Sequence, residues 1–172
     1  MTTTAISLAD LAEATDHYLA TEVEVRIGDV TRNLNPGGDG TFTVRVRNAD
    51  APRGIRLHDI TVHLFVGSDA VLTLGADVST MLEARASGSR SDALLPRTAD
   101  VASMYVFFPE DELGLPLSDV LEPGEEIEFI VNYHAEGRGE STINAHVHAS
   151  FSTADLFPRT SGPDAGKPVE IG

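Results

Sequence analysis

The amino-acid sequence predicts an all-β protein: an immunoglobulin-like antiparallel β-sandwich with a short N-terminal amphipathic helix. Two observations lead to this fold class. A series of short stretches alternates apolar with polar side chains, which gives each predicted strand one face to bury and one to expose. The connections carry Gly, Pro and Asp and are mostly too short for crossover helices, so sequential strands should pair antiparallel.

Length and composition limit what the protein can be. The chain has 172 residues, of which 41% are hydrophobic, enough for one domain with a core. It has no cysteine, which excludes disulfides and cysteine-ligated zinc. Its 27 acidic and 12 basic residues give a net charge of −15. Such a surface repels phosphate backbones, so we expect no nucleic-acid binding, and it favours protein partners with basic surfaces.

Residues 1–21 are predicted to form a helical arm. Ser7 can cap a helix, Asp10 falls in its first turn, and apolar side chains recur near helical spacing over residues 8–19. Such a helix can close one end of the sandwich or dock on a neighbouring subunit. The segment lacks the basic and apolar regions of a signal peptide, and no apolar run approaches a membrane span. We therefore expect no membrane association and a protein that is cytoplasmic or assembled into a particle.

The β-sandwich domain is predicted to span residues 22–157. In chain order, strands are expected at 23–27, 41–47, 60–66, 71–74, 104–108, 117–121, 126–133 and 142–151. Residues 75–100 break the pattern and read as an insertion. Residues 158–172 are rich in Gly and Pro and are expected to form an extended C-terminal tail.

The last two predicted strands organise the rest of the chain. Residues 125–151 read as one long antiparallel hairpin that turns around residues 137–139. A hairpin alone cannot bury its apolar face, so the other strands must supply a second layer. The apolar phase of the strands predicts a core that includes Phe42, Val44, Val62, Leu64, Phe129, Val131, Ile143 and Val147.

The most specific candidate site in the sequence is a pair of histidines. His146 and His148 share one face of their strand, and in the predicted hairpin Glu128 lies opposite one of them. Two imidazoles and a carboxylate could hold Zn²⁺ or Fe²⁺ with open positions. The alternative is a solvated strand face with cross-strand Glu–His pairs. We expect that alternative, with no metal and no other cofactor.

Other motifs carry weaker signals. The acidic turn at residues 110–112 lacks the spacing of a calcium loop, and residues 36–40 read as a hairpin turn rather than a phosphate loop. No ordered set of Ser, His and acid suggests a hydrolase. His17, His58 and His63 are scattered, and we expect them to be incidental.

Two segments resemble the bacterial and archaeal immunoglobulin-like modules of the CARDB type. Residues 39–48, DGTFTVRVRN, are similar to the second strand of such modules, which ends in Asn. Residues 121–129, LEPGEEIEF, are similar to the entry of a late strand. The resemblance implies a sandwich fold and a non-catalytic adhesion or spacer role, usually extracellular.

These observations lead to a non-enzymatic structural or protein-interaction subunit. We expect it to bind a protein partner or to self-assemble, as an oligomer or as a subunit of an assembled particle such as a phage virion, tail or injection machine. One alternative is a small metal-binding protein or metal-dependent enzyme that uses His146 and His148. Another is a processed extracellular adhesion or carbohydrate-associated module.

Overall fold

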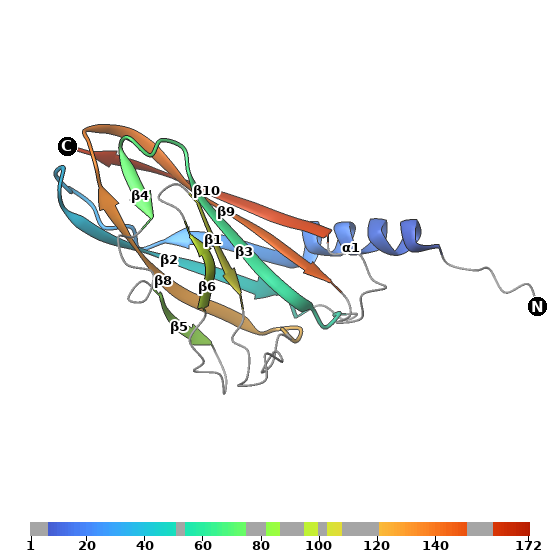
Figure 1. Ribbon diagram of the computed structural model, residues 1–172. Helices are drawn as coiled ribbons and strands as arrows, with labels where there is room; N and C mark the ends of the chain where they lie inside the picture. Colours follow the sequence, from blue (N-terminus) through green and yellow to red (C-terminus); the bar gives the residue numbers. More distant parts are fainter. Residues whose placement is uncertain are drawn as a thin grey trace, which may run out of the picture.

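The computed structural model describes residues 7–50, 54–74, 82–86, 95–99, 103–107, 121–150 and 160–172. In these ranges one helix precedes a sandwich of two β-sheets (Figure 1). The elements are α1 Leu8–Glu22, β1 Val23–Gly28, β2 Asp39–Asn48, β3 His58–Val66, β4 Leu72–Leu74, β5 Leu82–Ala86, β6 Leu95–Ala99, β7 Ser103–Phe107, β8 Glu126–Ala135, β9 Gly139–Ser150 and β10 Thr160–Ile171.

The strands divide between two antiparallel sheets. The first sheet has the order β1-β2-β8, and both β4 and β5 pair with the far side of β8. The second sheet has the order β10-β9-β3-β7-β6. Every strand pair in the described residues is antiparallel. The predicted fold class, an antiparallel sandwich with an N-terminal helix, is confirmed.

The core lies between the two sheets and follows the predicted apolar phase. Side chains alternate along β8 between buried and half-buried positions, as expected when a strand presents one face to a core. Phe42 and Phe129 are fully buried, and Phe42 packs on Tyr133 with ring centroids 6.2 Å apart. All eight core residues predicted from the sequence are buried.

The long hairpin is not observed. β8 pairs with β2, β4 and β5, whereas β9 pairs with β10 and β3, so the two strands lie in opposite sheets (Figure 1). The turn between β8 and β9 is held against the connection from β3 to β4. The N–H groups of Glu136 and Gly137 both donate to Val71 O in that connection, at 2.8 and 3.2 Å. Alternation shows which face a strand buries but not which strand lies beside it. Two amphipathic strands can therefore face each other across the core.

The expected C-terminal tail is also not observed. Residues 160–171 form β10, which pairs with β9 and buries Val169 and Ile171. Gly and Pro suggested an unpacked segment, but β10 is an edge strand, where a missing N–H is tolerated on the open side. Gly162 and Pro163 fall in a bulge between Ser161 and Asp164.

The predicted insertion contains regular structure as well. β5 and β6 both lie within residues 75–100, and each pairs with a neighbouring strand. The acidic turn at residues 110–112 and most of the strand predicted at 117–121 lie outside the described residues. Leu121 is described, and it bridges to Leu57.

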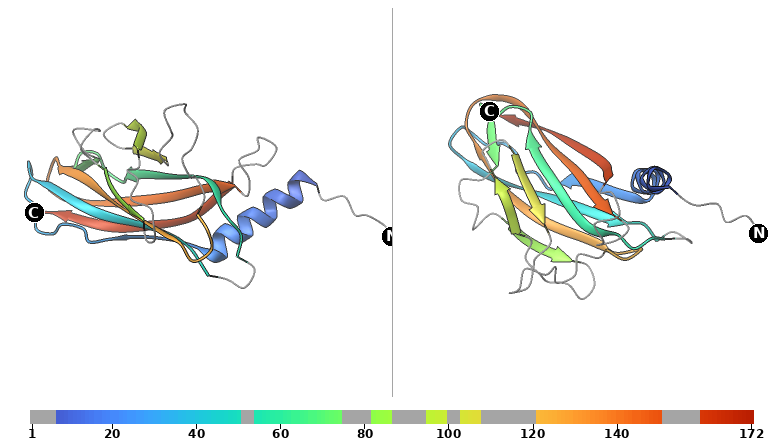
Figure 2. Two further views of the ribbon diagram at one scale, coloured as in Figure 1. Left: turned by 90° about the horizontal axis from the view of Figure 1, so that it is seen from below. Right: turned by 45° about the vertical axis from the view of Figure 1, so that its right-hand side comes forward.

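Helix α1 has a packed half and a projecting half. Ser7 and Asp10 form the predicted capping box, and the hydrogen bonds from the Ser7 hydroxyl and then its N–H lower the pKa of the Asp10 carboxyl. In the second half Tyr18 and Leu19 are buried next to β1 and β10. The first half extends past the strands (Figure 2), and Leu8 is 60% exposed. This helix, the one helix in the described residues, does not have the length and apolarity needed to cross a membrane.

A buried polar cluster joins this helix to the end of the sandwich. Asn48 is fully buried, and its Nδ2 donates to Ile55 O at 2.8 Å and to Leu121 O at 3.0 Å. The Tyr18 hydroxyl donates to Asn48 Oδ1 at 2.9 Å and accepts from Ile55 N–H at 2.8 Å. Gly124 N–H donates to Asn48 O at 2.7 Å, with Gly124 at a φ of 86° that favours glycine. Asn48 therefore ties the end of β2 to helix α1, to Ile55 and to residues 121–124.

Candidate functional site

Histidines collect on the outer face of the second sheet. His146 of β9 is the register partner of His63 on β3 and of Asp164 on β10. Ser103 begins the next strand, β7. We call Asp164, His146, His63 and Ser103 the histidine row, because they cross four adjacent strands on one face. They lie on the outer phase because their neighbours Val62, Leu64, Ala145 and Val147 point into the core.

Each histidine of the row has a polar partner. His146 Nδ1 and Asp164 Oδ1 form a hydrogen-bonded pair that is an ion pair when the imidazole is protonated. His63 Nε2 lies 2.7 Å from Ser103 Oγ. His148 packs edge-on against His146, with ring centroids 4.6 Å apart. The hydroxyl and the carboxylate are thus held by two different imidazoles.

An aromatic side chain borders a hollow beside this row. Phe65 is 37% exposed and stacks beside His63, with ring centroids 5.1 Å apart. The hollow has a volume of about 520 Å³ and is lined by Phe65, the two histidines of the row, Asn144 and Gly166, among others. A Cβ at Gly166 would lie 3.2 Å from Asn144 Oδ1, so a side chain there would crowd the hollow.

The outer face of the first sheet has a different character. Glu24 pairs with Arg26 at 2.9 Å, and Arg45 pairs with Glu128 across β2 and β8. The hydrogen bond from Arg45 to Glu128, and then the charge of Glu128, raise the pKa of Arg45. Charges that already have partners in water gain little from a further partner, so this face reads as a solvated surface.

The structure brings together only part of the predicted metal site. His146 and His148 are in contact, but Glu128 belongs to the opposite sheet, where it pairs with Arg45. The prediction placed Glu128 near the histidines because it assumed the β8–β9 hairpin. Within the described ranges, no group of three or more His, Asp or Glu side chains is arranged to hold a metal ion.

Sequence reasoning missed His63, Ser103 and Asp164. His63 does lie on the outer phase of its strand, and that pattern was the one available signal. Its pairing with His146 joins residues 83 positions apart through the register of β3 and β9, for which no local signal exists. Asp164 was missed because its segment was interpreted as a tail.

No protein-family model matches the chain, and no curated protein matches it. Solved structures do. The RrgA Jo.In complex is similar with a TM-score of 0.54 and 10% identity, over 90% of this chain and 81% of that one. A cohesin module of a family 33 glycoside hydrolase from Clostridium perfringens has a TM-score of 0.53 and 10% identity, over 88% and 98% of the two chains. AvmM, which catalyses macrocyclization in alchivemycin A biosynthesis, has a TM-score of 0.51 and 14% identity, over 88% and 89%.

These likenesses show the fold. The chain is an immunoglobulin-like sandwich of the kind found in cohesin and pilin modules. The solved structures also include a module of the CARDB type, which two segments of the sequence resemble. A CARDB domain of Pyrococcus furiosus, solved in complex with di-metal ions, is similar over 99% of this chain and 100% of that one, with 13% identity and a TM-score of 0.45.

Proposed function

We propose that this protein is a non-enzymatic protein-interaction module that binds its partner through the outer face of the β10-β9-β3-β7-β6 sheet. The observation that carries the proposal is the exposed Phe65 beside the histidine row and its hollow. Exposed aromatic side chains at a shallow concavity are typical of the centre of a protein interface. Among the described residues, the ion-paired face of the first sheet has no exposed aromatic side chain.

Charge favours a basic partner. The chain carries −15, and the proposed face contributes the carboxylates of Asp164 and Glu170 from β10. A negative field attracts a basic protein surface and speeds its association. The interaction should therefore weaken as salt rises, since salt screens charges at the rim of an interface.

The structural neighbours support the general part of this proposal, an interaction role, because several of them are modules of protein complexes or pili by name. A cohesin module, the RrgA Jo.In complex and a streptococcal pilus backbone protein share the fold, with TM-scores of 0.53, 0.54 and 0.51. One fold hosts many functions, so the surface of this chain, rather than the likeness, carries the argument. Self-assembly, incorporation into a phage particle and a cytoplasmic location stay predictions.

Site-specific photo-cross-linking tests the proposed face. With p-benzoyl-phenylalanine in place of Phe65, irradiation of the producing cells should give one dominant protein adduct, identified by mass spectrometry. The same residue in place of Arg47, on the outer face of the first sheet, is the matched control and should not give that adduct. Equal adducts from both positions, or none from position 65, would contradict the proposal.

An enzymatic function would centre on Ser103 and His63. A hydroxyl 2.7 Å from an imidazole can become a nucleophile when the imidazole accepts its proton, and AvmM shows that an enzyme can have this fold. In this chain the carboxylate of Asp164 orients His146 instead of His63. We therefore expect no labelling of Ser103 by a fluorophosphonate, as measured by intact mass. Stoichiometric labelling that is lost in both Ser103→Ala and His63→Ala would overturn the non-enzymatic proposal.

A further inference from the structure

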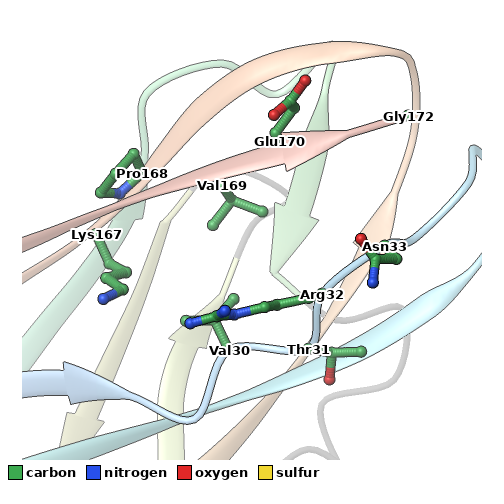
Figure 3. Close-up of a pocket in the computed structure, with 9 residues that line it drawn as sticks. All are labelled: Val30, Thr31, Arg32, Asn33, Lys167, Pro168, Val169, Glu170 and Gly172. Carbon is green, nitrogen blue, oxygen red and sulfur yellow. The ribbon is translucent and has the colours of Figure 1, made fainter.

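A second cavity lies on a different part of the molecule, between β10 and the connection from β1 to β2 (Figure 3). It has a volume of about 460 Å³. Residues 30–33 form one wall and residues 167–170 form the other. This size falls within the range of small-molecule sites in proteins.

Two cations share this cavity. The side chains of Arg32 and Lys167 both enter the space between β10 and the connection (Figure 3). Glu170 borders the cavity, but its carboxylate points to the other side of β10 (Figure 3). In the part of the chain that the structure describes, Arg32 and Lys167 have no ion-pair partner. The two positive charges therefore face the cavity together, while the carboxylate of Glu170 points away from it.

Other basic side chains of this acidic chain do form ion pairs. Acidic residues outnumber basic ones 27 to 12, so carboxylates are the commoner charged group. Arg26, Arg45 and Arg56 each pair with one. In the described residues Arg32 and Lys167, like Arg47 and Arg138, form no ion pair, so their charges stay available to a bound anion.

The position of Lys167 is also unusual. It is the register partner of the buried Ile143. It therefore lies on the same face of β10 as the buried side chains of Val169 and Ile171. The Lys167 side chain is exposed, and it lies on the side of β10 that faces the connection from β1 to β2 (Figure 3). Lys167 is the one lysine of the sequence.

The walls of the cavity are partly apolar. Val30 and Val169 line it together with the two cations, and Val169 lies on the same side of β10 as Lys167 (Figure 3). Guanidinium and ammonium groups recognise carboxylate and phosphate oxygens through charge-assisted hydrogen bonds. We propose that this cavity binds a small organic anion, with its carboxylate or phosphate group on Arg32 and Lys167 and its apolar part against Val30 and Val169.

Titration of the ¹⁵N-labelled protein with phenyl phosphate, benzoate and inorganic phosphate tests this site by NMR. Phenyl phosphate or benzoate should shift amide signals of residues 31–33, 167 and 169–172 and bind more tightly than inorganic phosphate, which has no apolar part. The organic probe that binds better identifies the anionic group. Arg32→Gln and Lys167→Gln should each weaken binding by about tenfold or more, because each removes a charged hydrogen-bond donor.

Arg56→Gln is the matched control, since Arg56 is an exposed arginine that pairs with Glu122 elsewhere on the molecule. Its affinity for the probes should equal that of the unmodified protein. Three results would each overturn the proposal: no shifts at millimolar probe, shifts scattered over the surface, or an affinity that Arg32→Gln leaves unchanged. Because the cavity and the histidine row involve different residues, failure here leaves the proposed recognition face untouched.

Discussion

Replacing Phe129 with alanine should lower the free energy of unfolding by roughly 3–5 kcal/mol. Phe129 is fully buried between the sheets, where it is register partner to Val44 on β2 and to Ala84 on β5. Truncation loses the free energy gained by transferring a phenyl ring from water into the core, and it leaves a cavity. The neighbouring strands are held in register by their hydrogen bonds, so they can close this cavity only in part. Chemical denaturation followed by circular dichroism measures the change.

Ile130→Ala is the matched control for this prediction. Ile130 is the next residue of β8 and is only half-buried on the outer face, so its truncation should cost roughly 1 kcal/mol. Similar costs for the two substitutions, or a cost below about 1 kcal/mol for Phe129→Ala, would mean that β8 presents its other face to the core.

Replacing Asn48 with alanine should also destabilise the protein by roughly 3–5 kcal/mol, for a different reason. Ile55 O and Leu121 O would each lose the hydrogen bond from Asn48 Nδ2, which leaves Leu121 O with the N–H of Leu57, and the Tyr18 hydroxyl would lose its acceptor Asn48 Oδ1. Buried polar groups without partners cost more than the hydrogen bonds contributed. Asn48→Asp, which keeps the shape but places a carboxylate against two carbonyl oxygens, should cost at least as much.

Tyr18→Phe gives a graded comparison for the same cluster. It removes one hydroxyl that bonds Asn48 Oδ1 and Ile55 N–H, so we expect a cost of roughly 1–2 kcal/mol. The double substitution with Asn48→Ala should cost less than the sum of the two, because the side chains share one network. Strict additivity in equilibrium unfolding would show that the cluster does not act as a unit.

The sequence predicted the inward faces of the strands because burial is encoded locally. Alternation placed Phe42 and Phe129 in the core, and the spacing of Ser7 and Asp10 predicted a cap that the structure contains. Such patterns involve residues within a few positions of one another. A strand with the wrong phase would bury charged side chains, so phase is strongly specified.

Pairing between strands could not be predicted in the same way. Glu128 was assigned to the histidines through a hairpin, whereas its partner is Arg45, 83 positions earlier in the chain. Asp164 lies in a segment whose Gly and Pro content resembled a tail, yet it meets His146 because β10 adds to the edge of β9. Both contacts depend on which strand lies beside which. A single sequence carries little local information on that choice.

The affinity of the partner for Phe65→Ala tests the central claim most directly. Once cross-linking has identified that partner, isothermal titration calorimetry with the purified proteins compares the unmodified chain, Phe65→Ala and Arg47→Ala. Truncation of an aromatic anchor at the centre of an interface should weaken binding by at least about tenfold, while Arg47→Ala should change it by less than about twofold. A partner that binds Phe65→Ala as tightly as the unmodified protein would contradict the assignment of this face.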